Sequence, residues 1–254
     1  MLAHARRRSY VRAAMTLHDA NSRAYYDDFS TSYEQPRGEG YHALIDALEV
    51  DAIRELARGK RVLEAGCGTG LVLSRIAEVA REAHGFDLSE GMVARARRRG
   101  LSVALGSVTQ VPFRDASFDL VCSFKVLAHV PQITEALTEL SRVTKPGGML
   151  ALEFYNPWSL RYAAKRVGGP GRISDGRTEA DVYTRWDTPF TIPKLLPPSL
   201  RLVDYRGIRV VTPLALVHTL PVVRHAFAAA ERASVTSPLR YFGGFLLAIL
   251  EKRV

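Results

Sequence analysis

Apolar residues in the first part of the chain follow a helical pattern. Between residues 41 and 59 they recur at near-helical spacing, at Leu44, Ile45, Leu48, Ile53 and Leu56. This spacing is typical of an amphipathic helix, and Gly59 provides a stop signal. We therefore expect residues 16–58 to be helical and to form an N-terminal lid.

From residue 60 the pattern changes to short apolar runs that alternate with helical stretches. The runs cover residues 61–65, 83–88, 101–105, 117–124 and 149–155, and the helical stretches cover 71–80, 89–99 and 131–143. This alternation predicts parallel β-α units, whose right-handed crossovers place helices on both faces of one sheet. Ligands bind such sheets at the carboxyl ends of the strands.

The alternation stops after Asn156. Residues 157–199 are rich in Gly, Pro and aromatic residues, with one helical piece near residues 159–166. A strand at 200–211, a helical insertion within 213–239 and a last strand at 242–250 follow. The last two strands predict an antiparallel edge. Because long insertions in compact domains are usually functional, we expect 157–199 and 213–239 to form the substrate side.

The composition fits one globular domain of 254 residues with a net charge of +9. The charge is uneven, since residues 1–14 hold four Arg and no acids, while residues 157–254 hold 15 basic and 7 acidic residues. Such a basic surface attracts acidic substrates, nucleic acids or anionic membranes, or it is simply solvated. We expect residues 1–15 to be a disordered basic tail in front of one domain over 16–254.

The two cysteines, Cys67 and Cys122, fall in segments that are predicted to be interior. A secreted disulfide framework needs more cysteines at loop positions, so we expect a reducing compartment, the cytoplasm. No apolar run reaches the roughly 20 residues of a spanning helix, so no transmembrane segment is predicted. No apolar stretch follows the basic cluster at residues 6–8, so we expect no signal peptide.

The glycine-rich segment 64–70 follows a predicted strand and opens a predicted helix. Its G-x-G-x-G spacing departs from the G-x-G-x-x-G of dinucleotide sites, which counts against NAD or FAD. Glycines let a methionine-like group lie against the backbone, and Glu64 supplies negative charge for a cation. Asp87 ends the next strand, where a carboxylate can accept hydrogen bonds from ribose hydroxyls. The alternatives are a plain strand–helix turn and an Asp that stabilises the following helix through its dipole.

Four stretches together resemble class I S-adenosylmethionine-dependent methyltransferases, in the branch that includes the ubiquinone and menaquinone enzymes. They cover residues 62–70, 86–92, 111–121 and 140–148, within a match over about residues 20–156. The resemblance implies an α/β fold: a Rossmann-like, seven-stranded, mostly parallel sheet with helices on both faces. The implied strand order is 3-2-1-4-5-7-6 with strand 7 antiparallel, and the implied cofactor is S-adenosyl-L-methionine.

The same resemblance implies a set of cofactor-binding residues. Those expected to line the methionine, ribose and adenine parts are Glu64, Gly66, Cys67, Gly68, Asp87, Leu88, Met92, Ser107, Val108 and Phe124. The family often has Asp where this chain has Ser107, so hydrogen bonding to the adenine amino group is expected to be weaker. An opening helix adds Tyr26 and Tyr33, whose rings suit a sulfonium, and Arg37, which suits the cofactor carboxylate. Ordinary helix packing is the alternative for these three.

Methyl transfer is an in-line displacement in which the protein mainly aligns the acceptor and excludes water. His129 follows the fourth strand and is the candidate base, the alternative being a His that packs on the next helix. The candidate substrate residues are Lys125, Tyr155, Asn156, Trp158 and Trp186. An aromatic, basic lid suits a planar or anionic substrate, unless the lid only packs on itself. We assign no metal site.

Three classes of function follow. The first is a methyltransferase for a quinone-like, natural-product, sugar or lipid acceptor. The second is an RNA methyltransferase, although no RNA-binding module or dense Lys/Arg stripe is found, so nucleic acid is not the expected partner. The third is a cofactor-binding protein without activity, because a fold does not settle function.

Overall fold

The computed structural model describes residues 17–30, 33–34, 40–168, 172–174, 177–178, 183–214, 217–218 and 221–254. The predicted basic tail over residues 1–15 and the cofactor candidate Arg37 lie outside these residues.

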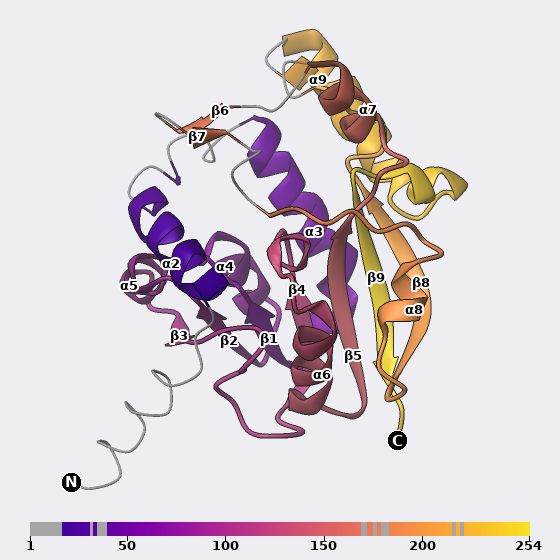
Figure 1. Ribbon diagram of the computed structural model, residues 1–254. Coiled ribbons are helices and arrows are strands. Elements are labelled where there is room, and N and C mark those ends of the chain that lie inside the picture. The colour runs from indigo at the N-terminus through magenta and orange to yellow at the C-terminus, as the bar shows by residue number, and fades with distance from the viewer. Residues whose placement is uncertain are drawn as a thin grey trace, which may run out of the picture.

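A seven-stranded sheet forms the centre of the molecule, in the order β3-β2-β1-β4-β5-β9-β8 (Figure 1). The strands are β1 Arg61–Ala65, β2 Glu82–Asp87, β3 Ser102–Leu105, β4 Phe118–Ser123, β5 Thr144–Tyr155, β8 Leu200–Ile208 and β9 Phe245–Lys252. The first five pair in parallel, and β9 runs antiparallel to both β5 and β8. Since β8 and β9 are the sixth and seventh strands of the sheet along the chain, the predicted order 3-2-1-4-5-7-6 with an antiparallel strand 7 is confirmed.

Helices surround this sheet as the alternating pattern predicts. They are α2 Leu17–Phe29, α3 Tyr41–Ala57, α4 Leu71–Ala77, α5 Glu90–Arg98, α6 Ile133–Val143, α7 Leu160–Gly168, α8 Ile192–Leu195 and α9 Pro221–Ser234, with 3-10 turns at Leu127–His129 and Pro238–Phe242. The short strands β6 Arg172–Ser174 and β7 Arg177–Thr178, which were not predicted, pair with each other. In the part of the chain that is described, no helix is both long and apolar enough to span a bilayer.

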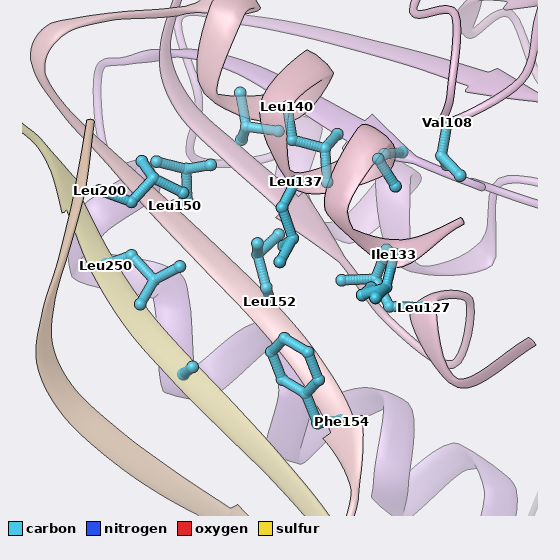
Figure 2. Close-up of a cluster of buried hydrophobic side chains, with 14 of the residues drawn as sticks. Val108, Leu127, Ile133, Leu137, Leu140, Leu150, Leu152, Phe154, Leu200 and Leu250 are labelled. Atoms are coloured by element: carbon cyan, nitrogen blue, oxygen red, sulfur yellow. The ribbon is translucent and has the colours of Figure 1, made fainter. Parts of the chain in front are cut away.

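Side chains of the central strand β5 alternate between two cores, because successive residues of a strand point to opposite faces. Leu150, Leu152 and Phe154 pack beneath α6, against residues such as Leu137 (Figure 2). On the other face, Ala151 joins the core built by α3 and α4, which includes Ile53. Both cores are buried, and they fix the strand ends that carry the site.

Element boundaries differ from the prediction at two functional junctions. Strand β5 begins at Thr144 rather than residue 149, because Thr144 pairs with Phe118 before the register shifts. Strand β8 ends at Ile208, and Arg209 follows with φ 59°, a conformation that stops the strand.

Candidate active site

The glycine-rich loop lies between β1 and α4 and turns its backbone toward a pocket. The amides of Gly66 and Cys67 donate to the Phe86 carbonyl at 2.8 and 3.0 Å, which ties the loop to β2. Gly66 has φ 73°, and a Cβ there would lie 2.3 Å from a Val126 methyl group, so only glycine fits. A Cβ on Gly68 would meet nothing nearer than Tyr33 at 3.9 Å. The backbone at Gly68 therefore faces open space.

Asp87 lies opposite this loop and is held by two backbone amides. Its Oδ2 accepts from the Gly68 amide at 2.8 Å, and its Oδ1 accepts from the Ser89 amide at 2.9 Å. Ser89 caps the N-terminus of α5, and its hydroxyl accepts from the Met92 amide at 3.1 Å. Burial raises the pKa of Asp87 above its usual value, although the two amides act in the opposite direction. The carboxylate lines the pocket, where it could accept hydrogen bonds from a diol.

A pocket that is partly open to solvent lies between the loop and Asp87. The predicted site residues that line it are Tyr26, Tyr33, Gly66, Gly68, Asp87, Leu88, Met92, Ser107, Val108, Phe124, Lys125 and His129. Sequence reasoning missed Ser22, Phe86, Gly106, Val126 and Val130. The remaining loop candidates, Glu64 and Cys67, line an adjoining cavity.

Ser107 closes one end of the pocket within a tight turn. Its hydroxyl lies 2.9 Å from the Thr109 hydroxyl and accepts from the Thr109 amide at 3.3 Å. Its carbonyl accepts from the Gln110 amide at 3.0 Å. The Ser107 side chain is thus occupied by its own turn.

Helix α2 is attached to the start of α5 by Asp27. Its Oδ1 accepts from the Ser89 hydroxyl at 2.5 Å and from the Gly91 amide at 3.0 Å. A Cβ on Gly91 would lie 2.6 Å from the Ser30 hydroxyl oxygen, so the two helices meet closely at this glycine. The attachment places Tyr26 over the pocket. Burial, followed by the nearby Tyr155, raises the pKa of the Tyr26 phenol far above its usual value.

Lys125 takes part in a buried charge cluster with three carboxylates, which we call the Lys125 cluster: Asp46, Glu49, Lys125 and Glu153. The Lys125 Nζ lies 2.9 Å from Asp46 Oδ1 and 2.8 Å from Glu49 Oε1, and its amide donates to Glu153 Oε1 at 3.0 Å. Burial lowers the pKa of Lys125, but Glu49 and Asp46 raise it more, so it stays above its ordinary value. Lys125 lines the pocket, but these contacts engage its ammonium, so a role toward an anionic acceptor stays a prediction.

His129 also lines the pocket, in the 3-10 turn after β4. Its Nδ1 lies 2.9 Å from the Tyr183 carbonyl oxygen. Because a carbonyl only accepts, Nδ1 carries the proton in this contact and Nε2 is left as the acceptor nitrogen of the neutral ring. Nε2 lies 3.4 Å from the Tyr155 hydroxyl. The sequence placed Tyr155 on the acceptor side, and the structure brings it to His129.

Three other predicted substrate residues do not line the pocket. The Asn156 amide group donates to the Tyr241 and Gly243 carbonyls at 2.8 and 3.0 Å, and its oxygen accepts from the Trp158 amide. Asn156 is fully buried, and its side chain joins β5 to a neighbouring segment, so a role toward the substrate stays a prediction. Trp158 packs on Phe190 at the surface. Trp186 packs on Tyr155 instead, with ring centroids 5.6 Å apart.

Comparison with known sequences identifies the segment that carries the pocket. Residues 63–152 match the methyltransferase domain family. The chain is 39% identical over 100 residues to a probable S-adenosylmethionine-dependent methyltransferase of Mycolicibacterium smegmatis, covering 39% of each chain. It is 35% identical over 140 residues to a demethylmenaquinone methyltransferase of Renibacterium salmoninarum, covering 53% of this chain and 59% of that one. The chain therefore spans less than two thirds of these relatives.

Solved structures show the same fold over most of the chain. A possible histamine N-methyltransferase of Thermotoga maritima has a TM-score of 0.62 and 19% identity, covering 91% of this chain and 99% of that one. The 1,6-didemethyltoxoflavin-N1-methyltransferase of Burkholderia thailandensis, with bound S-adenosylhomocysteine, has a TM-score of 0.59 and 18% identity, covering 96% and 94%. At this identity the likeness shows the fold alone.

Proposed function

We propose that this chain, whose residues 63–152 form a class I S-adenosylmethionine-dependent methyltransferase domain, transfers a methyl group to a small organic acceptor. The acceptor classes that we propose are quinone-like compounds, natural products, sugars and lipids. Relatives named as demethylmenaquinone methyltransferases favour a quinone-like acceptor among these. The observation that carries the proposal is the pocket between the open backbone at Gly68 and the buried carboxylate of Asp87.

The residues of the pocket fit S-adenosylmethionine. Glu64 Oε2 is buried without a hydrogen-bond partner in the cavity that adjoins the pocket. Leaving a buried polar atom unpaired is costly, and the ammonium of the cofactor would pair with it. Asp87 would hold the ribose hydroxyls, and Leu88 and Met92 would flank the adenine. When bound, the cofactor supplies a methyl group that its sulfonium activates for in-line transfer.

His129 and Tyr155 would handle a proton at the acceptor. The Tyr183 carbonyl keeps Nδ1 of His129 protonated, so Nε2 is the atom that receives a proton from a hydroxyl or amine acceptor. Burial raises the pKa of Tyr155 to about 12, so its hydroxyl stays protonated, and it would give up its contact with the single lone pair of Nε2 when the acceptor binds. Phe86, Phe124 and Val130 give the pocket apolar walls that exclude water.

A small molecule fits this pocket better than a nucleic acid does, because α2 is attached across it through Asp27. The cysteines Cys67 and Cys122 are buried free thiols, which suits our further proposal that the protein is cytoplasmic.

Turnover tests the proposal directly. Purified protein is incubated with S-adenosylmethionine and a panel of quinols, phenols, sugars, lipids and RNA, and S-adenosylhomocysteine release is measured. We expect release with at least one small-molecule class. For an acceptor that loses a proton, His129→Gln should lower kcat about 10²- to 10⁴-fold, while the exposed Glu135→Gln on α6 leaves it unchanged. Cofactor binding without turnover on any class would favour a non-catalytic cofactor-binding protein, and turnover on RNA alone would favour the nucleic-acid alternative.

A further inference from the structure

Arg161 lies at the start of α7 inside a cage of aromatic rings. Its guanidinium carbon is 4.4 Å from the ring centroid of Tyr155, 4.7 Å from Phe245 and 5.2 Å from Trp186. The residue is only 8% exposed. Aromatic faces attract a guanidinium, so the cage fixes its position.

This buried cation has no carboxylate partner among the residues that the structure describes. Its Nη1 is buried without any hydrogen-bond partner. Two buried acids of the neighbouring segments are engaged elsewhere. Asp187 forms a two-point ion pair with Arg185, at 2.7 and 2.8 Å. Glu231 accepts from three backbone amides, those of residues 210, 211 and 212.

A second cation, Arg209, converges on the same place. A Cβ on Gly244 would lie 3.1 Å from Arg161 Cδ and 3.3 Å from Arg209 Cδ, so the glycine gives both stems room to meet. Arg209 uses Nε and Nη2 to donate to the carbonyls of Thr212 and Pro213. Burial and, beyond it, the charge of Arg161 lower the pKa of Arg209. Arg161 is buried and Arg209 is half-buried, so their charges repel each other, and a bound anion would relieve this repulsion.

The arginine pair lies next to the acceptor side of the pocket. Tyr155, which stacks with Arg161, also contacts His129, with ring centroids 5.5 Å apart. His129 lines the pocket. Tyr155 is therefore the side chain that joins Arg161 to His129, next to the place where we propose the methyl group is transferred.

We propose that Arg161, with Arg209 beside it, binds an oxyanion of the methyl acceptor, either a carboxylate or a phosphate. Guanidinium groups pair with both oxyanions through parallel hydrogen bonds. The inference rests on the proposed function and narrows it, since it selects acceptors that carry an acidic group. If Arg161 were purely structural, it would join α7 to β5 and β9 through its aromatic contacts. That role would need neither a second arginine nor an Nη1 without a hydrogen-bond partner.

Tryptophan fluorescence can report the binding, because the chain has two Trp residues and Trp186 contacts Arg161. In a Trp158→Phe background, Trp186 remains as the only tryptophan. The probes are benzoate, phenyl phosphate and neutral benzamide, which resembles benzoate in shape. We expect a saturable change with benzoate, phenyl phosphate or both, which also identifies the oxyanion, and none with benzamide. Arg161→Met should weaken binding about tenfold or more, and Arg161→Lys less.

Matched variants separate the effect of a lost charge on anion binding from an effect on folding. Arg166→Met removes an exposed arginine of the same helix and should leave binding unchanged. If Arg161→Met does not fold, Gly244→Ala keeps both charges but displaces the two stems and should weaken binding too. Calorimetry on the same samples measures S-adenosylhomocysteine binding, which tests the proposed function separately from the anion site. If the nucleoside binds but neither anion saturates, or both bind Arg161→Met as well as the wild type, the anion site is refuted while the proposed function stands.

Discussion

Lys125 Nζ lies 2.9 Å from Asp46 Oδ1, a contact that joins the end of β4 to the middle of α3 across 79 residues of sequence. Glu49 provides a second contact one helical turn later, and the Lys125 backbone amide donates to Glu153. Lys125 has φ 58°, so the cluster holds a strained residue at the wall of the pocket. We infer that the Lys125 cluster supports the site rather than contacting an acceptor.

Removing the lysine should be costly because its carboxylate partners are buried. We expect Lys125→Met to lower the free energy of unfolding by about 3–5 kcal/mol, the usual effect of breaking a buried ion pair. The double variant Lys125→Met, Glu49→Gln should recover part of this loss. Urea unfolding measures both. For the single variant, a loss of unfolding free energy below about 1 kcal/mol is what an exposed ion pair would give. Such a loss would show that the carboxylates of the cluster are neutral without the lysine.

The attachment of α2 through Asp27 should control access to the pocket. Asp27→Ala removes the acceptor of both the Ser89 hydroxyl and the Gly91 amide. We expect faster amide hydrogen exchange in α2 and S-adenosylhomocysteine binding weakened about tenfold, with exchange in α6 unchanged. The neighbouring exposed Asp28→Ala serves as the control. Unchanged exchange in α2 of Asp27→Ala would mean that other contacts hold the helix.

Ser107→Asp should tighten cofactor binding. The Ser107 hydroxyl is occupied by Thr109, whereas a carboxylate can accept from the Thr109 amide with one oxygen and from the adenine amino group with the other. A charge-assisted hydrogen bond should improve the dissociation constant about tenfold. Ser107→Ala is the control for loss of the hydroxyl alone. Calorimetry that finds equal or weaker affinity for Ser107→Asp would place the adenine elsewhere.

The raised pKa of Asp87 predicts how binding depends on pH. Ribose hydroxyls donate to the ionised carboxylate, so a proton on Asp87 competes with the cofactor. Because burial raises this pKa, affinity for S-adenosylhomocysteine should fall as the pH drops through the raised value and should level off above it. In Asp87→Asn the profile should be flatter. Identical profiles for the two proteins would assign the dependence to another carboxylate, such as Glu64.

The features that the sequence predicts well are those carried by local pattern. The glycine spacing over residues 66–70, the Asp at the end of β2 and the β-α alternation all lie within short stretches, so fold and pocket follow from them. Contacts between residues that are distant in the sequence cannot be predicted from such short stretches. Asp46 and Glu49 are acidic positions on an amphipathic helix, where charge usually indicates solvent, and only the fold brings them to Lys125.

The acceptor side shows the same limit. Asn156 follows a strand end, which favours a functional position, but its amide is used by carbonyls 85 and 87 residues away. Arg161 is one basic residue among many in the C-terminal part, and its cage depends on Phe245 in the last strand. Neither role can be inferred from neighbouring residues in the sequence.

The central claim is that the backbone at Gly68 and the carboxylate of Asp87 together bind a sulfonium nucleoside and its product. Calorimetric titration of the wild type, Asp87→Asn and the exposed control Glu78→Gln with S-adenosylhomocysteine tests it most directly. We expect one site per chain in the wild type and in Glu78→Gln, and a loss of about 10- to 100-fold in affinity for Asp87→Asn, as for hydrogen bonds to a charged group. No binding to the wild type, or equal affinity for all three proteins, would contradict the account.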